Sequence, residues 1–132
     1  MNSLFVAALL VWPAISGAFI EHAPLRVNED GIRRSASKTT MPVYPADSKA
    51  HRIQGVVVVD LEYDGDGNVV WVNVIESPDQ STGKAAIDAV RNWKFLRTTV
   101  RGQPVHVKGK LTFYFRIDRN GIGRVENPKQ FK

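Results

Sequence analysis

The most restrictive feature of this sequence is a regular alternation of apolar and polar residues near its C-terminal end. The apolar set of this stretch consists of Val105, Val107, Leu111, Phe113, Phe115 and Ile117. The polar set consists of His106, Lys108, Lys110, Thr112, Tyr114 and Arg116. Successive side chains of a β-strand point to opposite faces of the sheet. The alternation therefore predicts one long strand with a dry face and a basic, solvated face.

A hairpin is predicted upstream of this strand. Residues 57–63 alternate in the same way, and residues 69–75 form a second apolar run that carries Val and Ile on both faces. The residues between them, 64–68, are Asp-Gly-Asp-Gly-Asn, which tolerate the backbone conformations of tight turns. If the strands alternate as expected, Val56, Val58 and Trp71 lie on the outer face of the hairpin. An apolar patch there favours a partner or a dimer, and the alternative is that the tail or the lead-in covers it.

A helix is predicted between the hairpin and the long strand. Ala86, Ala89, Val90 and Trp93 recur at three- and four-residue steps, and Ser81 or Thr82 is the expected N-cap. Residues 97–104 are expected to form a loop with its turn at Gly102. These elements predict an α+β fold of two layers: a three- to four-stranded antiparallel sheet with one main helix packed on a face.

The two ends of the chain have different characters. Residues 1–18 contain an apolar core followed by Ser16 and Ala18, which predicts a signal peptide cleaved before Phe19; a retained membrane anchor in residues 1–20 is the alternative. Residues 19–40 are expected to be a flexible lead-in, and residues 121–132 a short strand and polar tail. The folded part is then periplasmic, or anchored to the inner membrane and facing the periplasm, with membrane contact only if the anchor is retained.

Several functional classes are disfavoured by composition. Cysteine is absent, which excludes disulfides, thiolate metal sites and a cysteine nucleophile. The three histidines, His22, His51 and His106, lie in unrelated segments, and no phosphate-binding loop is present, so we expect no enzyme, metal site or cofactor. The formal charge of +5 and the basic strand face allow nucleic-acid binding, but an exported chain seldom meets nucleic acid, and we expect none.

A set of residues spaced over 41–120 resembles the C-terminal domain of TonB, the energy transducer of Gram-negative outer-membrane uptake. The shared positions are Tyr44-Pro45, Ile53, Gly55, Val57, Val59, Asp66-Gly67, Val69, Ser77, Ala85-Ala86, Ala89-Val90, Trp93, Phe95, Gly102, Pro104-Val105, Phe113 and Phe115. Most of them are expected to build the core, so function is expected elsewhere.

The resemblance implies a protein-binding module that adds an extended segment of an outer-membrane TonB-dependent transporter, or of another envelope protein, to a strand edge. The expected docking edge is that of the long strand, flanked by Lys108, Lys110, Thr112, Tyr114 and Arg116; the short strand near residues 122–125 could occupy it until a guest displaces it. A second candidate surface is the segment around Tyr44, Pro45 and Lys49. The alternative function is a periplasmic assembly module, TolA-like or homodimer-forming, without energy coupling.

Overall fold

The computed structural model describes residues 23–128. The predicted signal peptide and the extreme C-terminus lie outside the described residues. The helices are α1 (Glu29–Ser35), α2 (Ala46–Ala50) and α3 (Gln80–Val90). The strands are β1 (Leu25–Arg26), β2 (Ala36–Lys38), β3 (Gly55–Tyr63), β4 (Val69–Glu76), β5 (Lys94–Phe95), β6 (Thr99–Val100), β7 (Gln103–Pro104), β8 (Val107–Ile117) and β9 (Gly123–Glu126).

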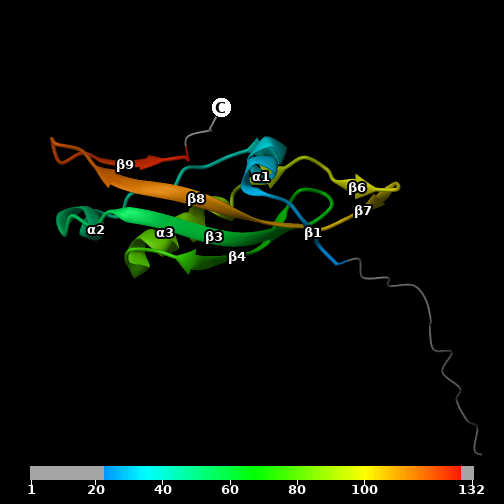
Figure 1. Ribbon diagram of the computed structural model, residues 1–132, viewed down its shortest axis with the longest axis horizontal. Coiled ribbons are helices and arrows are strands. Elements are labelled where there is room, and N and C mark those ends of the chain that lie inside the picture. The colour runs from blue at the N-terminus through cyan, green and yellow to red at the C-terminus, as the bar shows by residue number, and fades with distance from the viewer. Residues whose placement is uncertain (1–22, 129–132) are drawn as a thin grey trace, which may run out of the picture.

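The central sheet has the order β1-β8-β3-β4, and β9 also pairs with β8. The pairs β3–β4, β3–β8 and β8–β9 are antiparallel, whereas the short β1 runs parallel to β8. In Figure 1, β8 runs along the molecule with β3 on one side and with β9 and α1 on the other. The predicted α+β fold with one main helix is confirmed, and so are the hairpin and the long strand.

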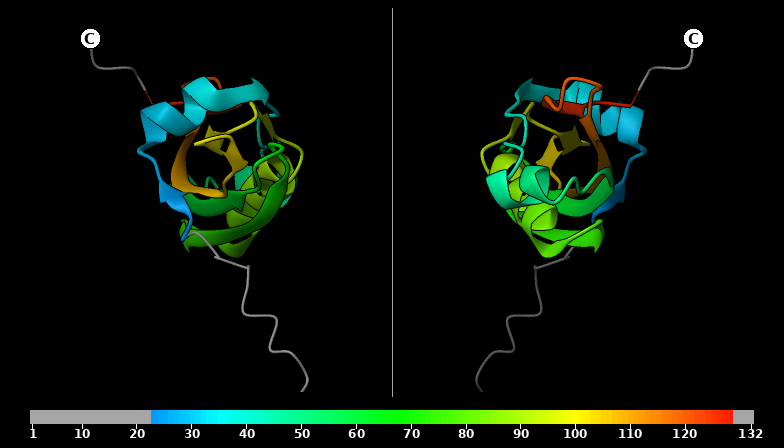
Figure 2. Two further views of the ribbon diagram at one scale, coloured as in Figure 1. Left: turned by 90° about the vertical axis from the view of Figure 1, so that its right-hand side faces the viewer. Right: turned by 90° about the vertical axis from the view of Figure 1, so that its left-hand side faces the viewer.

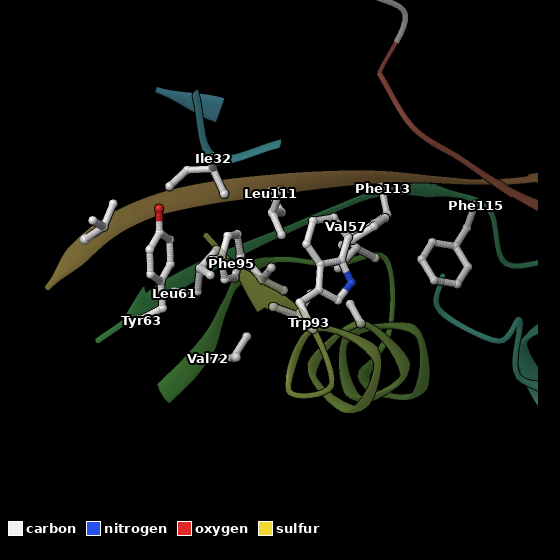
Figure 3. Packing of buried hydrophobic residues seen from close by; sticks show 14 of the residues in the cluster. Ile32, Val57, Leu61, Tyr63, Val72, Trp93, Phe95, Leu111, Phe113 and Phe115 are labelled. Atoms are coloured by element: carbon white, nitrogen blue, oxygen red, sulfur yellow. The ribbon is translucent and has the colours of Figure 1, made fainter. Parts of the chain in front are cut away.

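The core lies on the inner face of this sheet. Val57, Val59 and Leu61 of β3 face it together with Leu111, Phe113 and Phe115 of β8, and all six are fully buried. Figure 3 shows Trp93 among them, above the coils of α3. The indole Nε1 of Trp93 donates to the carbonyl of Thr40 at 2.8 Å, so its one polar atom is satisfied inside the core.

The N-cap of α3 differs from the prediction. Asp79, and neither Ser81 nor Thr82, caps the helix, because its Oδ1 accepts from the backbone N–H of Thr82 at 2.8 Å. Its other oxygen accepts from the buried hydroxyl of Ser48 at 2.7 Å, which ties α2 to the start of α3. Asp79 lies in the short connection between β4 and α3, so one residue both caps α3 and holds α2 against it.

Residues 19–40, which the sequence predicts to be a flexible lead-in, contain a helix and two short strands where the structure describes them. Residues 23–40 contain β1, α1 and β2, and β2 pairs with β5. Ile32 of α1 is fully buried and occupies the space beside Gly109 where a side chain would stand. Figure 2 shows that the curved sheet, α3 and this N-terminal segment surround one common interior. The sequence does not predict α1, because a seven-residue helix with a single buried residue has no apolar periodicity.

The predicted turn at Gly102 is present, and a second turn precedes β9. Arg101 and Gly102 adopt positive φ values of 50° and 78°, and they join β6 to β7 within the expected loop. Gly121 also has a positive φ, of 77°, in the turn that leads into β9. The predicted short strand near residues 122–125 is therefore found one residue further along, at Gly123–Glu126.

Candidate functional site

The edge of β8 that faces away from β3 is the candidate site. Thr112 lies opposite Val58 in the antiparallel register, yet both of its backbone polar groups bond to α1 rather than to β3. The carbonyl of Lys108 likewise accepts from the N–H of Val27 at 2.9 Å. Alternate residues of an antiparallel strand turn their N–H and C=O groups to opposite sides. The even-numbered residues of β8, which include all five predicted docking residues of this strand, therefore present their backbone to this edge.

In the structure this edge is covered along much of its length, which differs from the open edge that the sequence suggests. β1 pairs with Val107 and Lys108 at one end, and β9 pairs with residues 114–117 at the other. The sequence predicts that a short C-terminal strand can occupy this edge, and β9 does so. The contacts of residues 25–33 with the same edge are not predicted by the sequence.

The middle of the edge is covered by side chains instead of a strand. Glu29 Oε1 accepts from the backbone N–H of Thr112 at 2.7 Å, and Arg33 Nη2 donates to the carbonyl of Thr112 at 2.6 Å. Glu29 Oε2 also accepts from the hydroxyl of Thr112 at 2.9 Å. The two side chains pair with each other at 2.9 Å and are 26% and 17% exposed. We call this arrangement of Glu29, Arg33 and Thr112 the clamp.

Sequence reasoning missed the clamp, although signals for α1 are present. Asn28 caps the helix by accepting from the N–H of Gly31 at 2.9 Å. Glu29 and Asp30 lie in the first turn, and Arg33 and Arg34 in the last. This charge order complements the helix dipole, and Glu29 and Arg33 have the spacing of a helical ion pair.

The outer face of the sheet carries the other predicted docking side chains. The ammonium group of Lys108 lies 5.0 Å from the ring centre of Trp71, and the guanidinium of Arg116 lies 5.4 Å from that of Tyr114. Lys110 is exposed and lies opposite Asp60 in the register. Lys108 thus lies against Trp71 in the expected outer patch, and the face presents cations and aromatic rings together.

His106 and Glu62 lie within hydrogen-bonding distance on the same face, with 3.1 Å between Nδ1 and Oε2. Arg116 also pairs with Glu126 of β9 at 3.3 Å. In each pair at least one side chain is well exposed, so each pair contributes little to the stability of the fold. Their positions are more relevant to the recognition of charged partners.

The second predicted surface, around Tyr44, Pro45 and Lys49, adjoins the β9 end of the edge. The ring of Tyr44 packs edge-on against Phe115 at 5.1 Å, and its hydroxyl donates to the carbonyl of Ile53. Burial, with a smaller contribution from the charge of Asp79, raises the pKa of the Tyr44 hydroxyl. Pro45 precedes α2 as its N-cap residue, and Lys49 is exposed with its stem beside Gly123. Tyr44 is therefore largely a core residue, and Lys49 is the accessible member of this group.

The opposite edge of the sheet belongs to β4. The register between β3 and β4 shifts twice, and Val70 and Ile75 are the residues left over at these shifts. Both side chains are 51% exposed. β-Bulges at an edge twist the strand and interrupt its row of hydrogen-bonding groups. The regular part of the β4 edge is thus short compared with β8.

Within residues 23–128, no cluster of three or more histidine and acidic side chains has the arrangement of a metal site. None of the helices in that part of the chain has both the length and the apolar character needed to cross a bilayer.

Comparison with known proteins finds similarity to bacterial TonB proteins. The family model described as "Gram-negative bacterial TonB protein C-terminal" matches residues 40–117. Protein TonB of Xanthomonas campestris pv. campestris (strain B100) is 37% identical over 85 residues, which are 64% of this chain and 38% of that protein. Protein TonB of Vibrio cholerae serotype O1 is 22% identical over 107 residues, covering 80% of this chain and 43% of that protein.

A solved structure agrees with these matches. The solution NMR structure of the Pseudomonas aeruginosa TonB CTD superimposes with a TM-score of 0.54 at 28% identity, and the match covers 64% of this chain and 86% of that one. The chain spans well under half the length of the curated relatives it matches. The similarity therefore concerns the domain that carries the candidate edge.

Proposed function

The chain belongs to the family defined by the C-terminal domain of Gram-negative bacterial TonB proteins, and from this premise we propose that it is a partner-binding module of TonB-dependent transport. We infer that it docks an extended segment of an outer-membrane transporter, or of another envelope protein, by strand addition to β8. The observation that carries this proposal is the row of outward backbone groups on the even-numbered residues of β8, exemplified by Thr112.

The rigidity of β8 supports this role. Leu111, Phe113 and Phe115 are fully buried, and β3 pairs with nine consecutive residues of the strand. Because its inner face is fixed in the core, the outward backbone groups are held in place before a guest arrives. A preformed edge lowers the ordering cost that a guest strand must overcome.

Charge on the outer face supports an acidic or polar guest. Lys110 is exposed beside the edge, and Lys108 and Arg116 lie along the same face of β8. Like charges on this strand also disfavour pairing of β8 with a second copy of itself. We propose that these cations select the partner while main-chain hydrogen bonds supply affinity.

The test uses synthetic peptides that tile the periplasm-facing segments of the TonB-dependent transporters encoded in the same genome. Lys110→Glu should weaken the best-binding peptide about tenfold, whereas Lys84→Glu, the same charge change at an exposed position of α3, should leave it unchanged. Equal binding by both variants would place the docking site away from β8.

The second candidate function is an assembly module that forms homodimers or a TolA-like contact. The exposed Val70 and Ile75 on β4 favour it. If β4 forms the contact between two copies, Val70→Lys combined with Ile75→Lys should abolish self-association in sedimentation experiments. Val43→Lys is the matched control, because this side chain is 80% exposed and lies outside β4. A parent chain that sediments as a monomer at all concentrations rules the homodimer out.

We further propose that the module works in the periplasm after removal of residues 1–18. Intact-mass measurement of protein recovered from the periplasm should give a chain that begins at Phe19. Recovery of the uncleaved chain from the membrane fraction would instead support the anchored form.

A further inference from the structure

The clamp lies in the only stretch of the outward β8 edge that neither β1 nor β9 covers within the described part of the chain. The partners of β1 end at Lys108, and those of β9 begin at Tyr114. Between them, the residues that turn their backbone outward are Lys110 and Thr112. A guest strand that enters this stretch has to bond to Thr112, because Thr112 is one of only two residues there whose backbone faces outward.

Both backbone groups of Thr112 are already satisfied by the clamp. The carboxylate of Glu29 takes the N–H, and the guanidinium of Arg33 takes the C=O, with donor–acceptor distances of 2.7 and 2.6 Å. An incoming peptide would offer a carbonyl and an N–H to the same two groups. The two side chains therefore substitute for one residue of a neighbouring strand, and they compete directly with any guest.

We propose that the clamp is an intramolecular gate on the docking edge: Glu29 and Arg33 occupy Thr112 in the unbound protein and are displaced when a guest strand docks. This inference rests on the proposed function and adds a means of regulating the same site. Binding affinity for a guest is then set partly by how readily the clamp opens.

The composition of the clamp suits a reversible contact. Its bonds are charge-assisted and hence strong when made, yet both side chains remain partly exposed and can rotate to water without loss of the core. Arg33 also has contacts outside the clamp, since Nη1 donates to Asn127 Oδ1 at 2.9 Å and the guanidinium lies 5.6 Å from the Phe113 ring centre. Ile32 anchors α1 in the core next to the clamp, so the gate can open locally and close again.

A hollow of about 260 Å³ beside the clamp provides an approach for the guest. It is lined by residues of β1, α1, β3 and β8, among them Arg26, Lys108 and Lys110. Glu29 and Asp60 line the hollow together with these three cations. A guest with an acidic side chain here could take over the interactions that Glu29 makes in the unbound protein.

The experiment compares Glu29→Ala with Asp30→Ala, which removes the neighbouring exposed carboxylate of the same helical turn and has no contact with Thr112. The first readout is amide hydrogen exchange at Thr112, which needs no ligand. The amide should exchange about tenfold faster or more in Glu29→Ala, and at the parent rate in Asp30→Ala, because one charge-assisted hydrogen bond is lost only in the former.

The second readout is the dissociation constant of the transporter peptide that binds the parent chain most tightly in the tiling experiment. Glu29→Ala should bind it several-fold more tightly than Asp30→Ala does. If all three proteins bind the peptide equally, the gate is overturned while the docking function stands. If none of them binds any peptide, the proposed function fails, and the gate fails with it.

A milder substitution, Glu29→Gln, keeps the proposal testable if Glu29→Ala does not fold. Glu29→Gln keeps an oxygen that can accept from Thr112 but loses the charge, so both readouts should fall between the parent and Glu29→Ala. Near-ultraviolet circular dichroism of the buried Trp93 checks that each variant is folded. Should Glu29→Ala fail to fold, parent-like affinity in a folded Glu29→Gln would overturn the gate.

Discussion

Asp79 is the residue on which the junction between α2 and α3 depends. Its carboxylate caps α3 through Thr82 and also accepts from the buried hydroxyl of Ser48. Asp79→Ala should cost about 0.5–2 kcal/mol of unfolding free energy from the lost cap, and more because Ser48 loses its partner. Urea denaturation measures this cost. A variant with parent stability would show that other groups cap the helix.

The same carboxylate makes stability depend on pH. Burial by itself raises the pKa of Asp79, but hydrogen bonds from Thr82 and Ser48 outweigh it and hold the pKa below its ordinary value of 3.8. A carboxyl whose pKa is lower in the folded state stabilises the protein above the unfolded pKa, and this contribution disappears as the pH falls through the folded pKa. In Asp79→Asn, stability should therefore fall less steeply than in the parent as the pH drops below 3.8.

The control for this pH experiment is Asp88→Asn, which removes an exposed carboxylate from the same helix. It accounts for the change in net charge without touching the cap. Equal slopes for Asp79→Asn and Asp88→Asn in acid-unfolding curves would contradict the assignment.

At the scale of elements, the sequence predicts those whose periodicity extends over several residues. β3, β8 and α3 each bury a regular set of apolar side chains, and the alternation along Leu111, Phe113 and Phe115 is enough to orient β8. β4 buries only Val72, and its apolar run after a turn is what predicts it. α1 buries only Ile32, so its role depends on what lies opposite it, which local sequence does not encode. The clamp could not be predicted for the same reason, because Glu29 and Thr112 are 83 residues apart.

Substitutions of Trp93 test how α3 is fixed to the sheet. The indole is 2% exposed, lies just beyond the end of α3, and packs edge-on against Phe113 at 6.2 Å. Trp93→Ala should cost about 3–5 kcal/mol in thermal or urea unfolding because of the cavity it leaves. Trp93→Phe should lower the free energy of unfolding by less than Trp93→Ala does, because it keeps an aromatic ring in the core. It still loses the hydrogen bond to Thr40. Unchanged melting of Trp93→Ala would remove this residue from the core.

The contact between α1 and β8 can be tested by a double-mutant cycle. A Cβ added at Gly109 would clash with Cγ1 of Ile32, so Gly109→Ala should cost about 1–3 kcal/mol by overpacking. Ile32→Ala alone should cost about 2–5 kcal/mol. The double variant should cost less than the sum, because the smaller side chain makes room for the added methyl group. Strict additivity in urea unfolding would show that the two positions do not touch.

At the scale of the whole molecule, the question is whether residues 23–40 fold as one cooperative unit with the family domain. The family match covers residues 40–117, yet Ile32 lies in the same core cluster as Trp93 and Phe113. Ser35 also accepts, through its carbonyl, from the N–H of Leu96 at 2.7 Å. These contacts predict that the N-terminal segment and the domain unfold together.

The final prediction compares residues 19–132 with residues 41–132 in urea. The shorter chain should lose at least the roughly 2–5 kcal/mol expected for Ile32→Ala, because it removes that side chain together with the β2–β5 pair. Its m-value should also be smaller, since less surface becomes exposed on unfolding. Ile32→Ala in the longer chain separates the packing contribution from that of the rest of the segment. If both chains have the same midpoint and slope, the segment packs against the domain without stabilising it. If they differ as expected, residues 23–40 belong to the cooperative fold, and the packing of Ile32 holds α1 and the clamp against β8.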